Sequence, residues 1–139
     1  MRKLQTLQNT VLRLQTGLAK GTATEYLMDQ SGQLSVHQLS AYFSILQVHK
    51  CKMSKQPHYL YNRLFPGGDI IQDEMRLMRS IPNEHINISC DLTLTRNGFF
   101  YRASKLYNAL PAGVKDTLAL PSFKKLVKAW IKQNVTVRP

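Results

Sequence analysis

Residues 122–132 read SFKKLVKAWIK, and this stretch carries the clearest structural pattern in the chain. Its apolar residues recur at helical spacing: Phe123, Leu126, Val127, Trp130 and Ile131. Since an α-helix turns by about 100° per residue, they share one face. The lysines gather on the opposite face: Lys124, Lys125, Lys128 and Lys132. The pattern predicts an amphipathic helix that Ser122 caps and that buries Phe123, Leu126 and Trp130.

Four further helices are expected upstream of this segment. A helix over about 99–109 would face Tyr101, Arg102 and Lys105 outward and end at Pro111. A long helix over about 36–53, capped by Ser35, is apolar on two sides, which predicts a central helix with Phe43 and Leu46 buried. Residues 57–65 predict a short helix opened by proline, and residues 23–31, closed by Gly32, predict one or two helical turns.

The first twenty residues predict one more helix. Its apolar residues form one stripe: Leu4, Leu7, Val11, Leu14 and Leu18, with Leu12 alongside. Arg2, Arg13 and Lys20 fall together on the opposite face, and Gly17 and Gly21 end or weaken the helix. Two interpretations stay open for the basic face: a solvated back of an ordinary amphipathic helix, or a surface that binds phosphate.

Between these helical parts, Pro66-Gly67-Gly68 marks the clearest break in the sequence. Residues 86–95 alternate apolar and polar side chains, which predicts at most a minor β ribbon. We therefore expect a mainly α, single small helical domain of about five helices over residues 1–139. It would comprise an N-terminal helical part (1–65), a loop-rich connector (66–98) and a C-terminal helical part (99–139).

The charge of the chain is its most unusual bulk property. Its 139 residues include 19 Lys and Arg against 8 Asp and Glu, a net charge of +11. Such a surface attracts polyanions, most often nucleic acid, although it also suits an acidic protein partner or simple solubility. No apolar run is long enough for a signal peptide or a membrane span, so we expect a nuclear or cytoplasmic protein and no membrane partner.

The sequence contains no motif that indicates catalysis, a metal or a cofactor. Glycine-rich phosphate loops, GxSxG and HExxH are all missing, and Cys51 and Cys90 lie too far apart for a zinc knuckle. Asp73 and Glu74 are adjacent, so on a helix their side chains would diverge by about 100° and could not form a paired acid–base or metal site. We therefore expect no enzyme activity and no bound cofactor.

Three segments of the chain resemble a known family in the same order and spacing. They are residues 2–17 (RKLQTLQNTVLRLQTG), 32–65 (GQLSVHQLSAYFSILQVHKCKMSKQPHYLYNRLF) and 95–131 (TRNGFFYRASKLYNALPAGVKDTLALPSFKKLVKAWI). Together they are similar to the region downstream of the catalytic core in reverse transcriptases of non-LTR (LINE-like) retrotransposons of the jockey and chicken-repeat type. The chain departs from that pattern at Tyr107, where the family usually has tryptophan, and at Gln38, where a basic residue is common.

The resemblance implies a helical C-terminal region that follows the fingers, palm and thumb of a target-primed reverse transcriptase. The polymerising aspartates and any endonuclease of that family lie upstream of this region. The resemblance therefore adds the upstream reverse transcriptase domains to the candidate partners.

Three hypotheses on function follow from the residues and from the resemblance. The first is a non-catalytic domain that binds RNA or DNA through phosphate contacts, with no preference between the two determined by the sequence. Its candidate site residues are Lys124, Lys125, Lys128, Lys132, Arg102 and Lys105, with Tyr101 to stack on a base and with Arg2, Arg13 and Lys20 as a second surface. The second is a protein-interaction module that docks or self-associates through an apolar helix face. The third is a retrotransposon-derived fragment with no selected activity.

Overall fold

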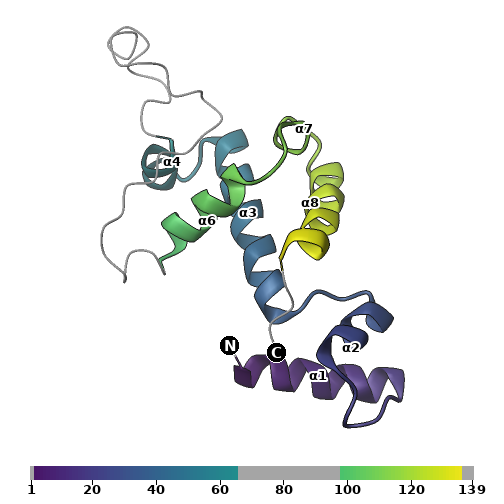
Figure 1. Cartoon of the computed structure of the whole chain (residues 1–139). Coiled ribbons are helices and arrows are strands. Elements are labelled where there is room, and N and C mark those ends of the chain that lie inside the picture. The colour runs from purple at the N-terminus through teal and green to yellow at the C-terminus, as the bar shows by residue number, and fades with distance from the viewer. Residues whose placement is uncertain (1, 66–97, 136–139) are drawn as a thin grey trace, which may run out of the picture. The chain divides into compact units, whose positions relative to one another are not determined.

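The computed structural model describes residues 2–65 and 98–135, and within them the chain is helical without strands (Figure 1). The helices are α1 (Arg2–Thr16), α2 (Thr24–Ser31), α3 (Val36–Ser54), α4 (His58–Leu64), α6 (Phe99–Asn108), α7 (Ala112–Lys115) and α8 (Leu120–Asn134). The mainly helical prediction is confirmed for these residues, although the helices outnumber the five expected. The predicted ribbon at 86–95 and nearly all of the connector at 66–98 lie outside the described residues.

The chain divides into two compact units. One comprises Met1–Phe43 together with Val127–Pro139, and the other comprises Ser44–Leu126. Both boundaries fall inside helices, so α3 and α8 each contribute residues to both units. No helix within residues 2–65 and 98–135 is long and apolar enough to cross a lipid bilayer.

Helix α1 turns its polar side inward, which corrects the sequence-based expectation. Its buried residues are Gln5, Asn9 and Leu12. Four residues of the predicted apolar stripe are exposed instead: Leu4, Leu7, Val11 and Leu14. The stripe alone therefore does not identify the face of this helix that packs within the chain.

Hydrogen bonds explain why polar side chains are tolerated on the buried side of α1. The side-chain oxygen of Gln5 accepts the Val36 backbone N–H at 2.9 Å, and its amide donates to Asn9 Oδ1 at 2.9 Å. Asn9 in turn donates to Thr24 Oγ1 at 2.9 Å, and Gln8 donates to the Leu34 carbonyl at 2.8 Å. Since buried polar groups are stable only when they are hydrogen-bonded, this network favours the inward orientation of Gln5 and Asn9.

The contact between α1 and α2 has a small apolar core. Leu12 of α1 packs with Leu27 and Met28 of α2, and Leu18 covers this cluster from the segment between the helices. Gly32 ends α2 with a left-handed backbone at φ 65°, as its position predicted.

Helix α3 begins at the predicted cap. Gln38 donates its backbone N–H to Ser35 Oγ at 3.3 Å, and Ser35 donates its own N–H to Gln38 Oε1 at 3.1 Å. This reciprocal pair is a capping box, and it satisfies two N–H groups at the start of the helix. The Gln38 amide also donates to the Val135 carbonyl at 2.8 Å, so this residue supports the start of α3 and the end of α8 in the same unit.

The unit Ser44–Leu126 has its own core around the second half of α3. Ile45, Val48 and His49 of α3 are buried, and His49 stacks on Phe123 of α8 with ring centroids 3.6 Å apart. Helices α4 and α6 contribute further buried residues: Leu60, Leu64, Ala103 and Tyr107. Leu46 is buried as predicted. The prediction that Phe43 is buried was wrong, because Phe43 shares an exposed side of α3 with Gln47 and Lys50.

Helix α8 starts earlier and buries a narrower face than the sequence predicted. It begins at Leu120, so Ser122 lies inside the first turn and is not the cap; Pro121 fits this turn because its fixed φ suits a helix start. Phe123, Val127 and Ile131, four residues apart, are fully buried. Leu126 is exposed and Trp130 is only half-buried, so the prediction that both belong to the core was wrong.

Candidate nucleic-acid interface

The lysines of α8 form the strongest candidate surface. All four side chains are exposed: Lys124, Lys125, Lys128 and Lys132. At about 100° per residue they span an arc of about 100° on the helix. Helix α8 contains no acidic residue to neutralise them, and Lys132 in its last turn also interacts favourably with the helix dipole.

The lysine arc flanks the buried face of α8 instead of lying directly opposite it. Around the axis of α8, at about 100° per residue, the middle of the lysine arc lies about 110° from the middle of the buried face formed by Phe123, Val127 and Ile131. The lysine stems therefore start beside the packed side of the helix, and their ammonium groups extend into solvent. The four lysines are exposed as predicted, but they do not lie opposite the buried face of α8, as the sequence pattern predicted.

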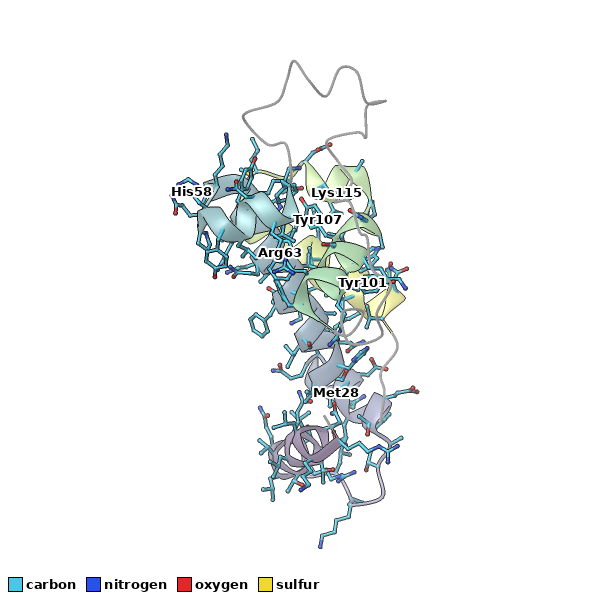
Figure 2. The ribbon with its side chains drawn as sticks, turned by 90° about the vertical axis from the view of Figure 1, so that its left-hand side faces the viewer. Met28, His58, Arg63, Tyr101, Tyr107 and Lys115 are labelled. Carbon is cyan, nitrogen blue, oxygen red and sulfur yellow. The ribbon has the colours of Figure 1, made fainter. Side chains whose placement is uncertain are left out.

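Three candidate residues lie on α6, with different exposure. Lys105 is exposed, whereas Tyr101 and Arg102 are half-buried because they adjoin the buried side of the helix, where Ala103 and Ser104 pack. Figure 2 labels Tyr101 on this helix. The outward orientation predicted for all three residues therefore holds fully only for Lys105.

The predicted second surface is not formed as one helix face. Helix α1 ends at Thr16, so Lys20 lies in the following turn and does not share a helical face with Arg2. Arg13 is half-buried and donates from Nη2 to the Thr22 carbonyl at 3.1 Å. Arg13 thus ties the loop to the helix, which leaves Arg2 and Lys20 as separate exposed charges.

The candidate residues belong to both compact units. Tyr101, Arg102, Lys105, Lys124 and Lys125 belong to the unit Ser44–Leu126. Arg2, Arg13, Lys20, Lys128 and Lys132 belong to the other unit. The four lysines share helix α8, and Tyr101, Arg102 and Lys105 share helix α6.

Two basic residues that the sequence analysis did not single out contact aromatic rings. The guanidinium of Arg63 lies 4.1 Å from the centroid of the Phe100 ring, which joins α4 to α6. Lys115 is buried, lies 5.8 Å from the Tyr107 ring and donates to the Asn108 carbonyl at 3.2 Å (Figure 2). Both are cation–π geometries, so a structural role accounts for part of the basic composition.

Burial shifts the pKa of three side chains in the unit Ser44–Leu126. It lowers the pKa of His49 from 6.5, and the positive charge of Lys52 acts in the same direction. Burial, with the negative charge of Asp116, raises the pKa of Tyr107 to about 12. Cys51 is buried as a free thiol, and burial raises its pKa, which disfavours the reactive thiolate.

No clustering that suits a metal site is found in the described part of the chain, where His, Cys, Asp and Glu side chains never gather in groups of three or more. Comparison with protein-family models, curated proteins and solved structures finds no match to this chain.

Proposed function

We propose that this chain is a non-catalytic, nucleic-acid-associated helical domain that contacts phosphates through the lysines of α8. The observation that carries the proposal is the row of four exposed lysines on one helix without an acidic residue. Lysine ammonium groups at this density suit a polyanion, since each contact releases counterions condensed on the phosphate backbone.

Other features support the same proposal. The net charge of +11 favours long-range attraction of RNA or DNA, and Lys105 adds an exposed charge in the unit Ser44–Leu126. The resemblance to the C-terminal region of non-LTR reverse transcriptases is in accord with a role beside nucleic acid, in the nucleus or the cytoplasm. In that setting the upstream polymerase domains are candidate partners, and the chain itself carries no polymerase chemistry.

The test replaces Lys124, Lys125, Lys128 and Lys132 together by glutamine. Binding of the chain to single-stranded RNA and to single-stranded DNA is then measured by fluorescence anisotropy over a series of salt concentrations. We expect weaker binding to both, and a slope of log K against log salt that shrinks by about 0.7 per lost contact, hence by about two to three if most lysines engage. Circular dichroism should show an unchanged fold, because all four side chains are exposed.

A variant with an equal charge change provides the control. It carries glutamine at four lysines outside the candidate site: Lys3, Lys50, Lys52 and Lys55. If both quadruple variants lose the same affinity, the attraction is due to bulk charge and the α8 site is refuted. Wild-type chain that does not bind at physiological salt would refute the function itself.

The non-catalytic part of the proposal has a separate test. Purified chain with primer, template, deoxynucleotides and Mg²⁺ should incorporate no nucleotide above a mock preparation. Incorporation that survives repurification would overturn it.

A further inference from the structure

The apolar stripe of α1 is a surface that the packing of the described residues, 2–65 and 98–135, leaves exposed. Leu4, Leu7, Val11 and Leu14 are 58%, 63%, 62% and 81% exposed. They form a continuous row on one helix, whereas singly exposed apolar side chains are common and carry no meaning. The row ends at Leu14, since Leu18 lies beyond the helix and packs on the α1–α2 cluster.

The spacing of the row indicates what kind of surface would cover it. Its members are separated by three, four and three residues, which is the alternation of the two core positions of a heptad. At about 100° per residue the four side chains span an arc of only about 80°. An arc this narrow matches the seam between two helices, whereas a helix that inserts into a bilayer surface needs a broader apolar face.

The opposite side of α1 is already engaged, so the helix is held with the stripe outward. Gln5, Asn9 and Leu12 face the interior, where Gln5 accepts a hydrogen bond from the Val36 N–H and Asn9 donates one to Thr24. The stripe centre is rotated by about 145° from the centre of this buried side, at about 100° per residue. A partner can therefore reach the stripe while α1 keeps its internal contacts.

Charge favours an acidic partner over a second copy of the chain. The charged residues of α1 are Arg2, Lys3 and Arg13, and none is acidic. Lys3 flanks the stripe on one side, and the neutral Gln8 and Gln15 flank it on the other. Two copies would place equal basic charges together, and each carries a net charge of +11, so self-association through this helix is opposed electrostatically.

We propose that the α1 stripe (Leu4, Leu7, Val11 and Leu14) docks an amphipathic helix of another protein whose apolar seam is flanked by acidic residues. The partner side chains would pack between the four stripe residues, and a partner carboxylate would pair with Lys3. The proposal is independent of nucleic-acid binding, because it uses neither α8 nor its lysines.

The test uses the full chain and a synthetic helical peptide of four heptads with leucine at both core positions and glutamate at both flanking positions. Binding of the labelled peptide is measured by fluorescence anisotropy. The seam variant combines Leu7→Ser with Leu14→Ser, and it should bind the peptide at least tenfold more weakly than the wild type. The matched control, Leu118→Ser, removes an exposed leucine outside α1 and should bind as the wild type does.

Two further comparisons separate docking from charge attraction. A peptide with the same glutamates but glutamine at the core positions should not bind, and neither should a peptide with leucine core and lysine flanks. The chain with glutamine at Lys124, Lys125, Lys128 and Lys132 should bind the original peptide normally. Loss of peptide binding in that variant would show that the acidic peptide occupies the α8 lysines, which overturns the docking proposal but not the nucleic-acid proposal.

Other occupants of the stripe give distinct results that would also overturn the proposal. If sedimentation shows a dimer of the wild-type chain that the seam variant converts to monomer, the occupant is a second copy. If the chain binds vesicles of phosphatidylcholine and phosphatidylserine and the seam variant does not, the occupant is a lipid surface. An equal affinity of wild type and seam variant for the peptide would show that the stripe binds no helix.

Discussion

The inverted orientation of α1 can be tested by comparing Gln5→Ala with Leu7→Ala. Gln5 is buried at 5% exposure and accepts the Val36 N–H while donating to Asn9 and Gln8. Its removal leaves the part-buried Val36 N–H and the buried Asn9 Oδ1 without these partners, which should lower the free energy of unfolding by about 1–3 kcal/mol. Leu7 is 63% exposed, so its truncation should change the free energy of unfolding by about 0.5 kcal/mol or less.

The assay is urea unfolding followed by far-ultraviolet circular dichroism, with the free energy extrapolated to water. Gln15→Ala serves as the matched control, because it removes the same amide from an exposed position of the same helix. It should leave the free energy of unfolding nearly unchanged. A larger destabilisation by Leu7→Ala than by Gln5→Ala would refute the orientation of α1 and remove the basis for a docking stripe.

Three further predictions concern the cores and the helix ends. Phe123→Ala should lower the free energy of unfolding by about 3–5 kcal/mol, because Phe123 is fully buried against His49. Leu126→Ala on the same helix should lower it by about 1 kcal/mol or less, because Leu126 is exposed. Equal losses in urea unfolding would contradict the assigned buried face of α8. Because the pKa of His49 is lowered from 6.5, the unfolded chain binds more protons than the folded chain below that pH. The melting temperature should therefore fall as the pH decreases from about 7, and His49→Phe should reduce this dependence. Gly32→Ala should cost about 1–2 kcal/mol in urea unfolding through its left-handed backbone alone, because no atom lies within 4 Å of the added methyl group.

Much of the helical architecture could be predicted from local patterns. The cap at Ser35, the turn at Gly32 and the short helix after Pro57 lie where the sequence places them, because capping and turn formation depend on neighbours within a few residues. The start of α8 was misplaced at Ser122, since Pro121 is equally acceptable in a first helical turn and the serine pattern alone could not distinguish the two.

The candidate site could be predicted only in part, because the burial of a basic side chain depends on contacts distant in sequence. Exposure of the α8 lysines follows from their charge, because ammonium groups are rarely buried without partners. The half-buried Arg13 and the buried Lys115 donate hydrogen bonds to the carbonyl groups of Thr22 and Asn108. In neither case do the two partners lie on the same helix, so helical periodicity carries no signal for either contact.

The helical class, several of the helix ends and the positive charge follow from the sequence, because they depend only on residues and their near neighbours. The tertiary structure alone decided which face of each helix is covered. For α1 the hydrogen bonds of Gln5 and Asn9 with residues far along the chain place the polar side inward, and the leucine row remains in solvent. Hydrophobic periodicity predicts that an apolar stripe will be buried against something, but whether that surface belongs to the same chain or to a partner depends on contacts distant in sequence.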